Sequence, residues 1–548
     1  MVRAPSAKNK MRRRRLSIIS GVLSLLLLLQ AGSPLSQRNR RIARDEVLDM
    51  LHHALDSYMK HAYPWDELKP LSCEGRRWDQ RERGTLDDSL GGYGLTLVDS
   101  MSTLAIVQDG PRLADAVRRV VDDVSFDRDV DISVFEATIR VLGGLLSTHE
   151  LLLTFPDLLS GSAFIYGGEL LILAKDLGDR LLPAFETPTG IPSHRVNLRR
   201  GMIKSETRQT CVAAAGTLLL EMAWLTRLTG VDTYELKARR AVDAVWRRRS
   251  SKGLVGNTID IDNGHWHETH SGIGAGIDSF YEYLLKSFIL TGDQALLADF
   301  EAAYEAAQKH TTWGEWNIEV SMQAGQPYSY RVSALQAFWP SLQVLHGDLS
   351  GAKATHLAFY KLWKRYRALP EIYDVKSNRL LHFARDSPLR PEFAESTFHL
   401  YTATGSEFYL DVAFELVHAL QNISRVDCGF AAIADVRTHR LDDRMDSYFI
   451  AETLKYLFLT FDRSLEVEDQ VSLFCPVVPP GRPSFNASYM APHRPCLPAV
   501  RALWTTEGHL VILDGGPLDL QLNGTEVPPT LTTGAENSTA AGQCASIR

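Results

Sequence analysis

Helical hairpins whose turns contain Thr-Gly recur along this chain of 548 residues. Apolar helical patterns stop at Thr229-Gly230, Thr291-Gly292 and Thr404-Gly405, and a second helical pattern follows each stop. Glycine readily adopts the left-handed conformation that ends many helices, so each junction indicates a turn between two helices. Apolar helical spacing is found at 47–58, 135–153, 211–228, 278–291, 295–309, 354–366, 392–403, 406–421 and 447–461. Unevenly spaced hairpins of this kind predict an all-α toroid rather than a regular array.

Short β-hairpins and one irregular segment interrupt this helical pattern. Residues 259–262 and 265–267 flank Asn263-Gly264, a dipeptide typical of tight hairpin turns. Prolines gather within 466–502, which excludes regular helix and predicts an insertion there. Residues 503–513 could form a strand that packs back, whereas the composition of 514–548 is typical of a disordered tail. We therefore expect one large domain over residues 45–513.

The N-terminus predicts entry into the secretory pathway. A basic segment is followed by an apolar run at 16–29, so residues 1–31 form either a cleaved signal peptide or a signal anchor. Six cysteines fit an oxidising compartment, and N-glycosylation sequons begin at Asn422, Asn486, Asn523 and Asn537. A formal net charge of −7 argues against nucleic acid as a partner.

Carboxylates lie inside apolar helical patterns in four separated segments. The charged residues are Glu136 and Arg140, Asp278 and Glu282, Arg390, Glu392 and Glu395, and Glu452. A buried ionised carboxylate is costly unless it is paired, hydrogen-bonded or metal-bound, so we expect these segments to share one acidic cavity. Enclosed carboxylate pairs are what glycoside hydrolysis requires.

Each segment also has a simpler interpretation. Glu136 and Arg140 could form a solvated ion pair, and Glu392 could merely cap a helix N-terminus. Tyr448 could stack on a sugar ring or belong to the core.

The same segments resemble glycoside hydrolase family 47, the class I α-1,2-mannosidases, and within it the branch linked to ER-associated degradation. The resemblance covers about residues 45–465 and resumes at 505–509. It is carried by Phe135–Leu146, Asp278–Lys286, Leu389–Glu392 and Ala451–Leu457. Cys73 and Cys428 lie in motifs that point to the degradation-linked branch.

The resemblance implies an (α/α)7 barrel with short β-hairpins, and a Ca²⁺-dependent enzyme of the endoplasmic reticulum lumen. Such an enzyme removes α-1,2-linked mannose, with inversion, from high-mannose N-glycans on misfolded glycoproteins and so promotes their degradation. By motif, Glu136 would be the general acid, Asp278 and Glu392 the candidate bases, and Thr506 the Ca²⁺ ligand. The residues expected to contact substrate are Arg140, Glu221, Arg390, Glu395, Tyr448, Glu452 and Glu507.

The resemblance further implies a Cys73–Cys428 disulfide. Cys475, Cys496 or Cys544 would then remain for a mixed disulfide with an oxidoreductase of the protein disulfide isomerase type.

A catalytically weak or inactive, lectin-like receptor for trimmed or misfolded glycoproteins is the alternative. Three departures from the family pattern allow it. Ser102 and Asp446 replace a usual aspartate and a usual glutamate, and Ala334 stands where the processing mannosidases have a histidine.

Overall fold

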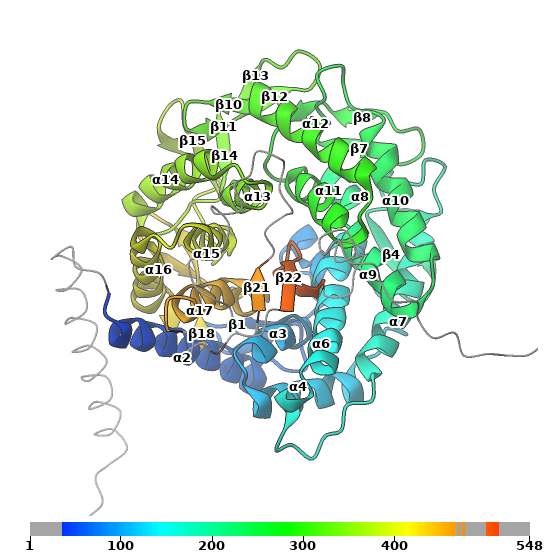
Figure 1. The fold of residues 1–548 in the computed structure, drawn as a ribbon. Coiled ribbons are helices and arrows are strands. Elements are labelled where there is room, and N and C mark those ends of the chain that lie inside the picture. Colours follow the sequence, from blue (N-terminus) through cyan, green and yellow to red (C-terminus); the bar gives the residue numbers. More distant parts are fainter. Residues whose placement is uncertain (1–34, 467–470, 472–473, 477–499, 514–548) are drawn as a thin grey trace, which may run out of the picture.

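A ring of paired helices encloses a central β-hairpin (Figure 1). The structure is a computed structural model that describes residues 35–466, 471, 474–476 and 500–513. In this part of the chain, seven inner helices surround the centre and seven outer helices pack behind them. The predicted toroid of helical hairpins is therefore confirmed.

The inner helices are almost wholly buried; in α3 (Leu95–Ile106), for example, every residue is buried. Four of the inner helices are preceded by short helical turns, and two of these turns are π-helices. The other inner helices and their preceding turns are α5 (Val134–Glu136), η2 (π, Ala137–Leu142) and α6 (Gly143–Thr154); α8 (Val212–Gly216) and α9 (Leu219–Thr229); α11 (Asp278–Thr291); η5 (3-10, Ala334–Phe338) and α13 (Trp339–His346); α15 (Glu392–Thr404); and η7 (π, Phe449–Thr453) and α17 (Leu454–Asp462).

Each outer helix packs against one inner helix through its apolar face. The outer helices are α2 (Gln37–His61), α4 (Gly110–Asp123), α7 (Glu169–Leu181), α10 (Thr233–Trp246), α12 (Gln294–Thr311), α14 (Leu349–Tyr366) and α16 (Glu407–Ala419). Six of them directly follow their inner partner in the chain, whereas α2 packs on α17, which is the last inner helix. This contact between the first and last helices closes the ring.

The two ends of the barrel differ in the length of their connections. Most turns from inner to outer helices are short, and left-handed glycines at Gly230, Gly292 and Gly405 end three inner helices, as predicted. The polar residue after the turn caps the next helix in one of these three cases, where Asp293 accepts the N–H of Ala295. The connections from outer to inner helices are longer and contain the short strands. The strands therefore lie at the end of the barrel where the inner helices begin.

The strands of these connections form small antiparallel sheets, which include the hairpin predicted around Asn263-Gly264. Their strands are β1 (Glu67–Lys69) with β2 (Glu74–Arg76); β3 (Asp131–Ser133), β4 (Arg195–Asn197) and β5 (Gly201–Met202); β6 (Gln209–Cys211), β7 (Thr258–Asp260) and β8 (Trp266–Glu268); β9 (His270–Ser271), β12 (Glu319–Ser321) and β13 (Pro327–Ser329); β10 (Thr312–Trp313) with β11 (Trp316–Asn317); β14 (Arg331–Ser333), β15 (Ile372–Asp374) and β16 (Arg379–Leu380); β17 (Arg425–Val426) with β18 (Gly429–Phe430); and β19 (Ala432–Asp435) with β20 (Arg440–Asp442). Four further short helical turns complete the described elements: η1 (Gly84–Ser89), η3 (Pro156–Leu159), η4 (Leu182–Phe185) and η6 (Leu420–Ser424).

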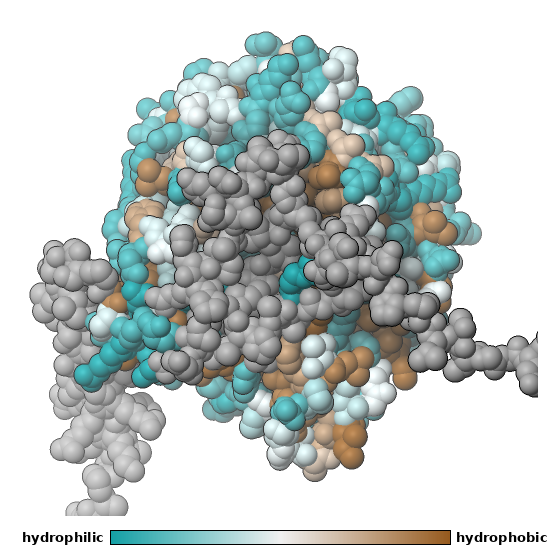
Figure 2. Space-filling model, in the orientation of Figure 1, coloured by the Kyte–Doolittle hydropathy of each residue, from teal (hydrophilic) through white to brown (hydrophobic). Residues whose placement is uncertain are grey.

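The strand expected within 503–513 is a hairpin that fills the centre of the ring. β22 (Val500–Trp504) pairs antiparallel with β23 (Leu510–Ile512) and parallel with β21 (Phe474–Pro476). Trp504 and Leu510 are buried, and the hydroxyl of Ser147 on α6 accepts the N–H of Leu510 at 2.9 Å. The tip of this hairpin, residues 505–509, lies inside the barrel. On the face of the molecule in Figure 2, hydrophilic residues predominate around the outer rim, as expected for outer helices with one apolar face.

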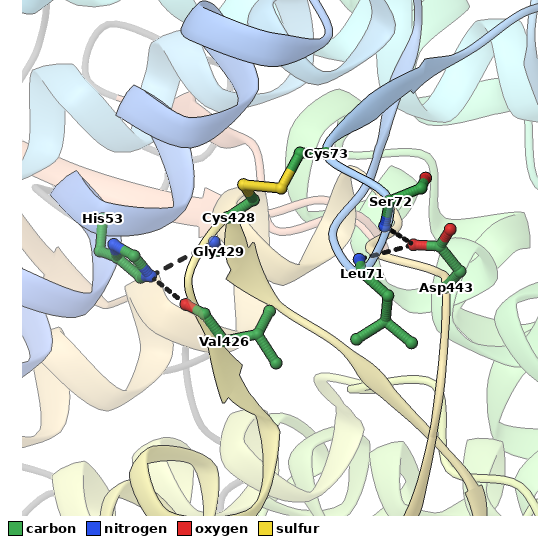
Figure 3. The surroundings of a disulfide bond; sticks show 8 residues. All are labelled: His53, Leu71, Ser72, Cys73, Val426, Cys428, Gly429 and Asp443. Carbon is green, nitrogen blue, oxygen red and sulfur yellow. Dashed lines mark hydrogen bonds between the residues drawn. A yellow bond between two sulfur atoms is a disulfide. The ribbon is translucent and has the colours of Figure 1, made fainter.

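A disulfide between Cys73 and Cys428 joins the first and last parts of the ring (Figure 3). Cys73 lies between β1 and β2, and Cys428 lies between β17 and β18. Nearby hydrogen bonds tie the same two regions: Asp443 accepts the N–H of Leu71 at 2.6 Å, and a ring nitrogen of His53 on α2 lies 2.8 Å from the carbonyl oxygen of Val426. The pairing expected from the resemblance is confirmed.

Several sequence predictions fall outside the described residues: the leader, most of the 466–502 insertion, the tail, and the sequons at Asn486, Asn523 and Asn537. Asn422 is exposed on η6, and its glycosylation stays a prediction. Within the described part of the chain, no helix has the length and apolar character needed to cross a membrane.

Candidate active site

An acidic cavity of about 260 Å³ opens inside the barrel. Among the described residues that line it, seven carry carboxylates and two carry guanidinium groups. The lining includes these sequence-predicted residues: Glu136, Arg140, Asp278, Arg390, Glu392, Glu395, Tyr448, Glu452, Thr506 and Glu507. Segments that are far apart in the chain therefore meet at one site, as their buried charges led us to expect.

The three predicted catalytic carboxylates occupy equivalent places in the fold. Glu136 lies in the first turn of α5, Asp278 is the first residue of α11, and Glu392 is the first residue of α15. Because every inner helix begins at the same end of the barrel, these starting positions bring the carboxylates to one level. The positive end of a helix dipole favours negative charge there.

Arg140 links the candidate acid to the tip of the central hairpin. Its guanidinium donates to Glu136 at 2.7 Å and to Glu507 at 2.7 Å, and lies 3.9 Å from Asp99. Its charge is thus shared among three carboxylates. The side chain of Glu136 is 27% exposed, against 12% for Arg140, so Glu136 faces the open part of the cavity. The ion pair considered from sequence is therefore formed, and it lines the cavity rather than the outer surface of the barrel.

Burial raises the pKa of the two candidate bases. The pKa of Asp278 is raised to about 7, with a further contribution from the negative charge of Glu282. Burial raises the pKa of Glu392 to about 8, against the opposing effect of Arg390. Burial thus makes both carboxyls weaker acids than an exposed side chain of the same type.

The deeper carboxylates repel one another. Burial is the main reason that the pKa of Glu395 lies well above its usual range, and the negative charge of Glu282 is the second. The pKa of Glu452 is raised in the same way, by burial first and by the charge of Glu507 second. Burial also raises the pKa of Glu507 to about 7, although Arg140 opposes this change. Burial and mutual repulsion therefore favour the protonated forms of these carboxyls, because seven carboxyl groups share the cavity with two guanidinium groups.

Tyr448 and Arg390 form one wall of the cavity. Arg390 binds both carboxylate oxygens of Glu371, at 2.5 and 3.0 Å, and its guanidinium lies 6.0 Å from the ring centroid of Tyr448. The Tyr448 hydroxyl donates to the carboxylate of Asp446, which is also bound by Arg83 and Arg444. Asp446 thus orients this aromatic wall.

Buried hydrogen bonds position the hairpin tip that carries Thr506 and Glu507. His509 is fully buried, and its Nε2 lies 3.1 Å from Asp99 and 3.2 Å from the carbonyl oxygen of Arg140. Both partners are acceptors, so Nε2 carries the proton and Nδ1 accepts the Ser102 hydroxyl at 3.1 Å. The Ser102 hydroxyl thus serves as the donor to the unprotonated Nδ1 of a neutral His509.

Glu221 lies behind the cavity and does not line it. It is fully buried on α9 and accepts the hydroxyl of Tyr283 at 2.5 Å. The same hydroxyl oxygen accepts the N–H of Thr506 at 3.4 Å. Glu221 therefore reaches the site through Tyr283, and burial raises its pKa to about 8.

The structure adds lining residues to which the sequence analysis assigned no role, although Glu282 was among the charges expected in the cavity. Glu282 faces the cavity and pairs with Lys286, which also donates to the carbonyl oxygen of Thr505 at 3.3 Å. Its i, i+4 spacing from Asp278 was a usable signal. Cys211 and Phe338 also line the cavity, but nothing in their sequence context distinguishes them from core residues.

Comparison with known proteins identifies the class to which this barrel and its acidic cavity belong. The chain belongs to glycosyl hydrolase family 47, whose family model matches residues 50–475. It is 45% identical over 452 residues to ER degradation-enhancing alpha-mannosidase-like protein 3 of Homo sapiens, covering 80% of this chain and 48% of that protein. It is 41% identical over 469 residues to ER degradation-enhancing alpha-mannosidase-like protein 2 of Homo sapiens, covering 85% of this chain and 79% of that protein.

A plant relative and a solved structure extend the comparison. Alpha-mannosidase I MNS4 of Arabidopsis thaliana is 44% identical over 429 residues, covering 78% of this chain and 66% of the relative. The alpha-1,2-mannosidase from Trichoderma reesei superposes with a TM-score of 0.70 at 23% identity, over 88% of this chain and 100% of that chain. The expected family and the (α/α)7 barrel are thus confirmed. The chain spans about half the length of the protein 3 relatives from Xenopus laevis and Homo sapiens.

Proposed function

We propose that this chain is an inverting α-1,2-mannosidase that trims high-mannose N-glycans on misfolded glycoproteins. The observation that carries the proposal is the convergence of Glu136, Asp278 and Glu392 on one cavity. Relatives named as ER degradation-enhancing alpha-mannosidase-like proteins support the same substrate, location in the endoplasmic reticulum lumen and promotion of ER-associated degradation.

In this mechanism the carboxylates divide the proton transfers between them. Glu136 delivers a proton to the leaving glycosidic oxygen, and Arg140 holds its carboxylate in one orientation. Asp278 and Glu392 are the candidate bases, and burial raises the pKa of both into the range of a proton acceptor that works near neutral pH. The base takes a proton from a water that attacks the opposite face of the sugar, which gives inversion. Tyr448 offers an aromatic face for a sugar ring.

A Ca²⁺ ion fits the oxygen-rich floor of the cavity. Among the described residues, no three Asp, Glu, His or Cys side chains converge as a direct ligand set. We therefore propose that Thr506 supplies its hydroxyl and carbonyl oxygens, while neighbouring carboxylates such as Glu452 and Glu507 act through water. When bound, the ion would hold sugar hydroxyls and balance negative charge on these carboxylates.

The proposed oxidoreductase partner would use cysteines other than those in the barrel. Cys73 and Cys428 are bonded to each other, and burial raises the pKa of Cys211 to about 11, which makes its thiol a poor nucleophile at neutral pH. A mixed disulfide would therefore form at Cys475, Cys496 or Cys544, whose side chains lie outside the described part of the structure.

Mannose release by the purified chain tests the proposal. We expect the wild type to shorten a high-mannose N-glycan in the presence of Ca²⁺, and Glu136→Gln to bind the glycan with little release. A wild type that binds the glycan without releasing mannose, with or without a disulfide isomerase, would identify the lectin-like alternative instead.

A further inference from the structure

The segment that delivers Arg390 and Glu392 to the cavity bends sharply at Leu389. Leu389 has a φ of +63°, in the left-handed region that residues with branched side chains rarely adopt, and its side chain is buried. Pro388 and Pro391 lie on either side and have no N–H with which to anchor the backbone. Hydroxyl groups of a neighbouring segment instead reach the carbonyl groups of this bend.

Two hydroxyl groups from one neighbouring segment hold these carbonyls. The Thr453 hydroxyl donates to the carbonyl oxygen of Leu389 at 2.8 Å. The Tyr448 hydroxyl shares its single proton between the carbonyl oxygen of Pro388 and the carboxylate of Asp446, each at 2.9 Å. The two donors are five residues apart, and a π-helix forms i→i+5 hydrogen bonds. The π-helical turn η7 therefore places Tyr448 and Thr453 one turn apart, facing the same bend.

Packing alone does not fix the position of this bend. Arg390 and Glu392 line the catalytic cavity on one side and a second, mostly apolar cavity of about 70 Å³ on the other. Leu389 and Thr453 also line this second cavity. With space on both sides, the segment could relax toward an unstrained conformation if its hydrogen bonds were removed.

We propose that Thr453 is a positioning residue whose hydroxyl holds Leu389 in its strained conformation and so aims Arg390 and Glu392 into the catalytic cavity. This assignment rests on the proposed mannosidase function. Thr453 acts through the backbone of the bend, and the hydroxyl is the group that matters.

The full chain with Thr453→Val tests this role, since valine keeps the shape of threonine and removes its hydroxyl. Thr460→Val is the matched control, because Thr460 is equally buried and its hydroxyl donates to Tyr456 within α17, away from the bend. We expect Thr453→Val to lower kcat for mannose release at least tenfold and to raise KM at least tenfold, because the bend carries both Arg390, an expected substrate contact, and Glu392, a candidate base. Thr453→Ser, which keeps the hydroxyl, and Thr460→Val should both stay within threefold of wild type.

Two results would overturn the proposal. Wild-type kcat in Thr453→Val would show that the hydroxyl is dispensable, and an equal loss in Thr453→Ser would assign the effect to packing of the methyl group. If Thr453→Val does not fold, adding Leu389→Gly, which takes a positive φ without strain, should recover both folding and activity. No recovery in this double variant would count against the role of strain.

If the wild type releases no mannose, the proposed function fails while the positioning role remains testable. The same variants are then compared by calorimetry with a high-mannose oligosaccharide. We expect Thr453→Val to lose at least tenfold in affinity while Thr453→Ser retains wild-type affinity. Equal affinities in all variants would refute the positioning role.

Discussion

The Cys73–Cys428 disulfide gives a stability prediction whose size follows from the chain path. The two cysteines are 355 residues apart, so the bond closes a loop that contains most of the barrel. The chain-entropy relation gives about 6 kcal/mol for a loop of this length, which is above the range of roughly 0–5 kcal/mol typical of disulfides. With an unfolding entropy scaled to roughly 450 ordered residues, this free energy corresponds to a fall in Tm of about 6 °C.

The double variant Cys73→Ser/Cys428→Ser tests this estimate by thermal unfolding followed with circular dichroism. We expect its Tm to fall by about 6 °C, and each single variant to show the same loss because either removes the bond. A reducing agent provides the matched control. It should lower the Tm of the wild type to that of the double variant and leave the double variant unchanged.

A fall of less than about 1 °C would refute the reasoning. It would mean that the unfolded chain keeps residual structure that already brings the two cysteines together, so that the bond removes little entropy.

Three further predictions concern the cavity. Arg140→Met should lower the free energy of unfolding in urea by about 3–5 kcal/mol, because buried carboxylates lose their partner. The control Arg118→Met, at an exposed ion pair, should lower it by less than about 1 kcal/mol. Equal losses in the two variants would contradict the buried role of Arg140. The rate of mannose release should rise as the pH increases through about 7, because the base must be ionised and the pKa of Asp278 is raised to about 7. A rate that falls over this pH range would contradict Asp278 as the base. Chelation of Ca²⁺ should abolish release and lower Tm, and added Ca²⁺ should restore both; unchanged activity after chelation would remove Thr506 from a metal-binding role.

The positions of the carboxylates proposed to be catalytic could be predicted from sequence because burial leaves a clear signal. Glu136, Asp278 and Glu392 stand among apolar residues at the starts of helical patterns, and few structures tolerate such charges without a shared site. Left-handed glycines likewise predicted the short turns of the barrel.

Other features depend on tertiary structure and leave no local signal. Glu221 lies in an apolar helical pattern of the same kind as those of the cavity residues. Periodicity predicts which face of a helix is buried, but it does not predict how far along the barrel axis a residue lies. The π-helical turns η2 and η7 and the positive φ of Leu389 were likewise not predictable, because their side chains are compatible with ordinary helix and loop. They arise where neighbouring segments must fit together around the cavity.

The central claim is that two carboxylates act across a water on an α-linked mannose. Proton nuclear magnetic resonance of the first sugar released by the wild type tests it most directly. We expect β-mannose to appear first and to convert slowly to the equilibrium mixture of anomers. Initial release of α-mannose, or no release from any α-1,2-linked substrate, would contradict the account.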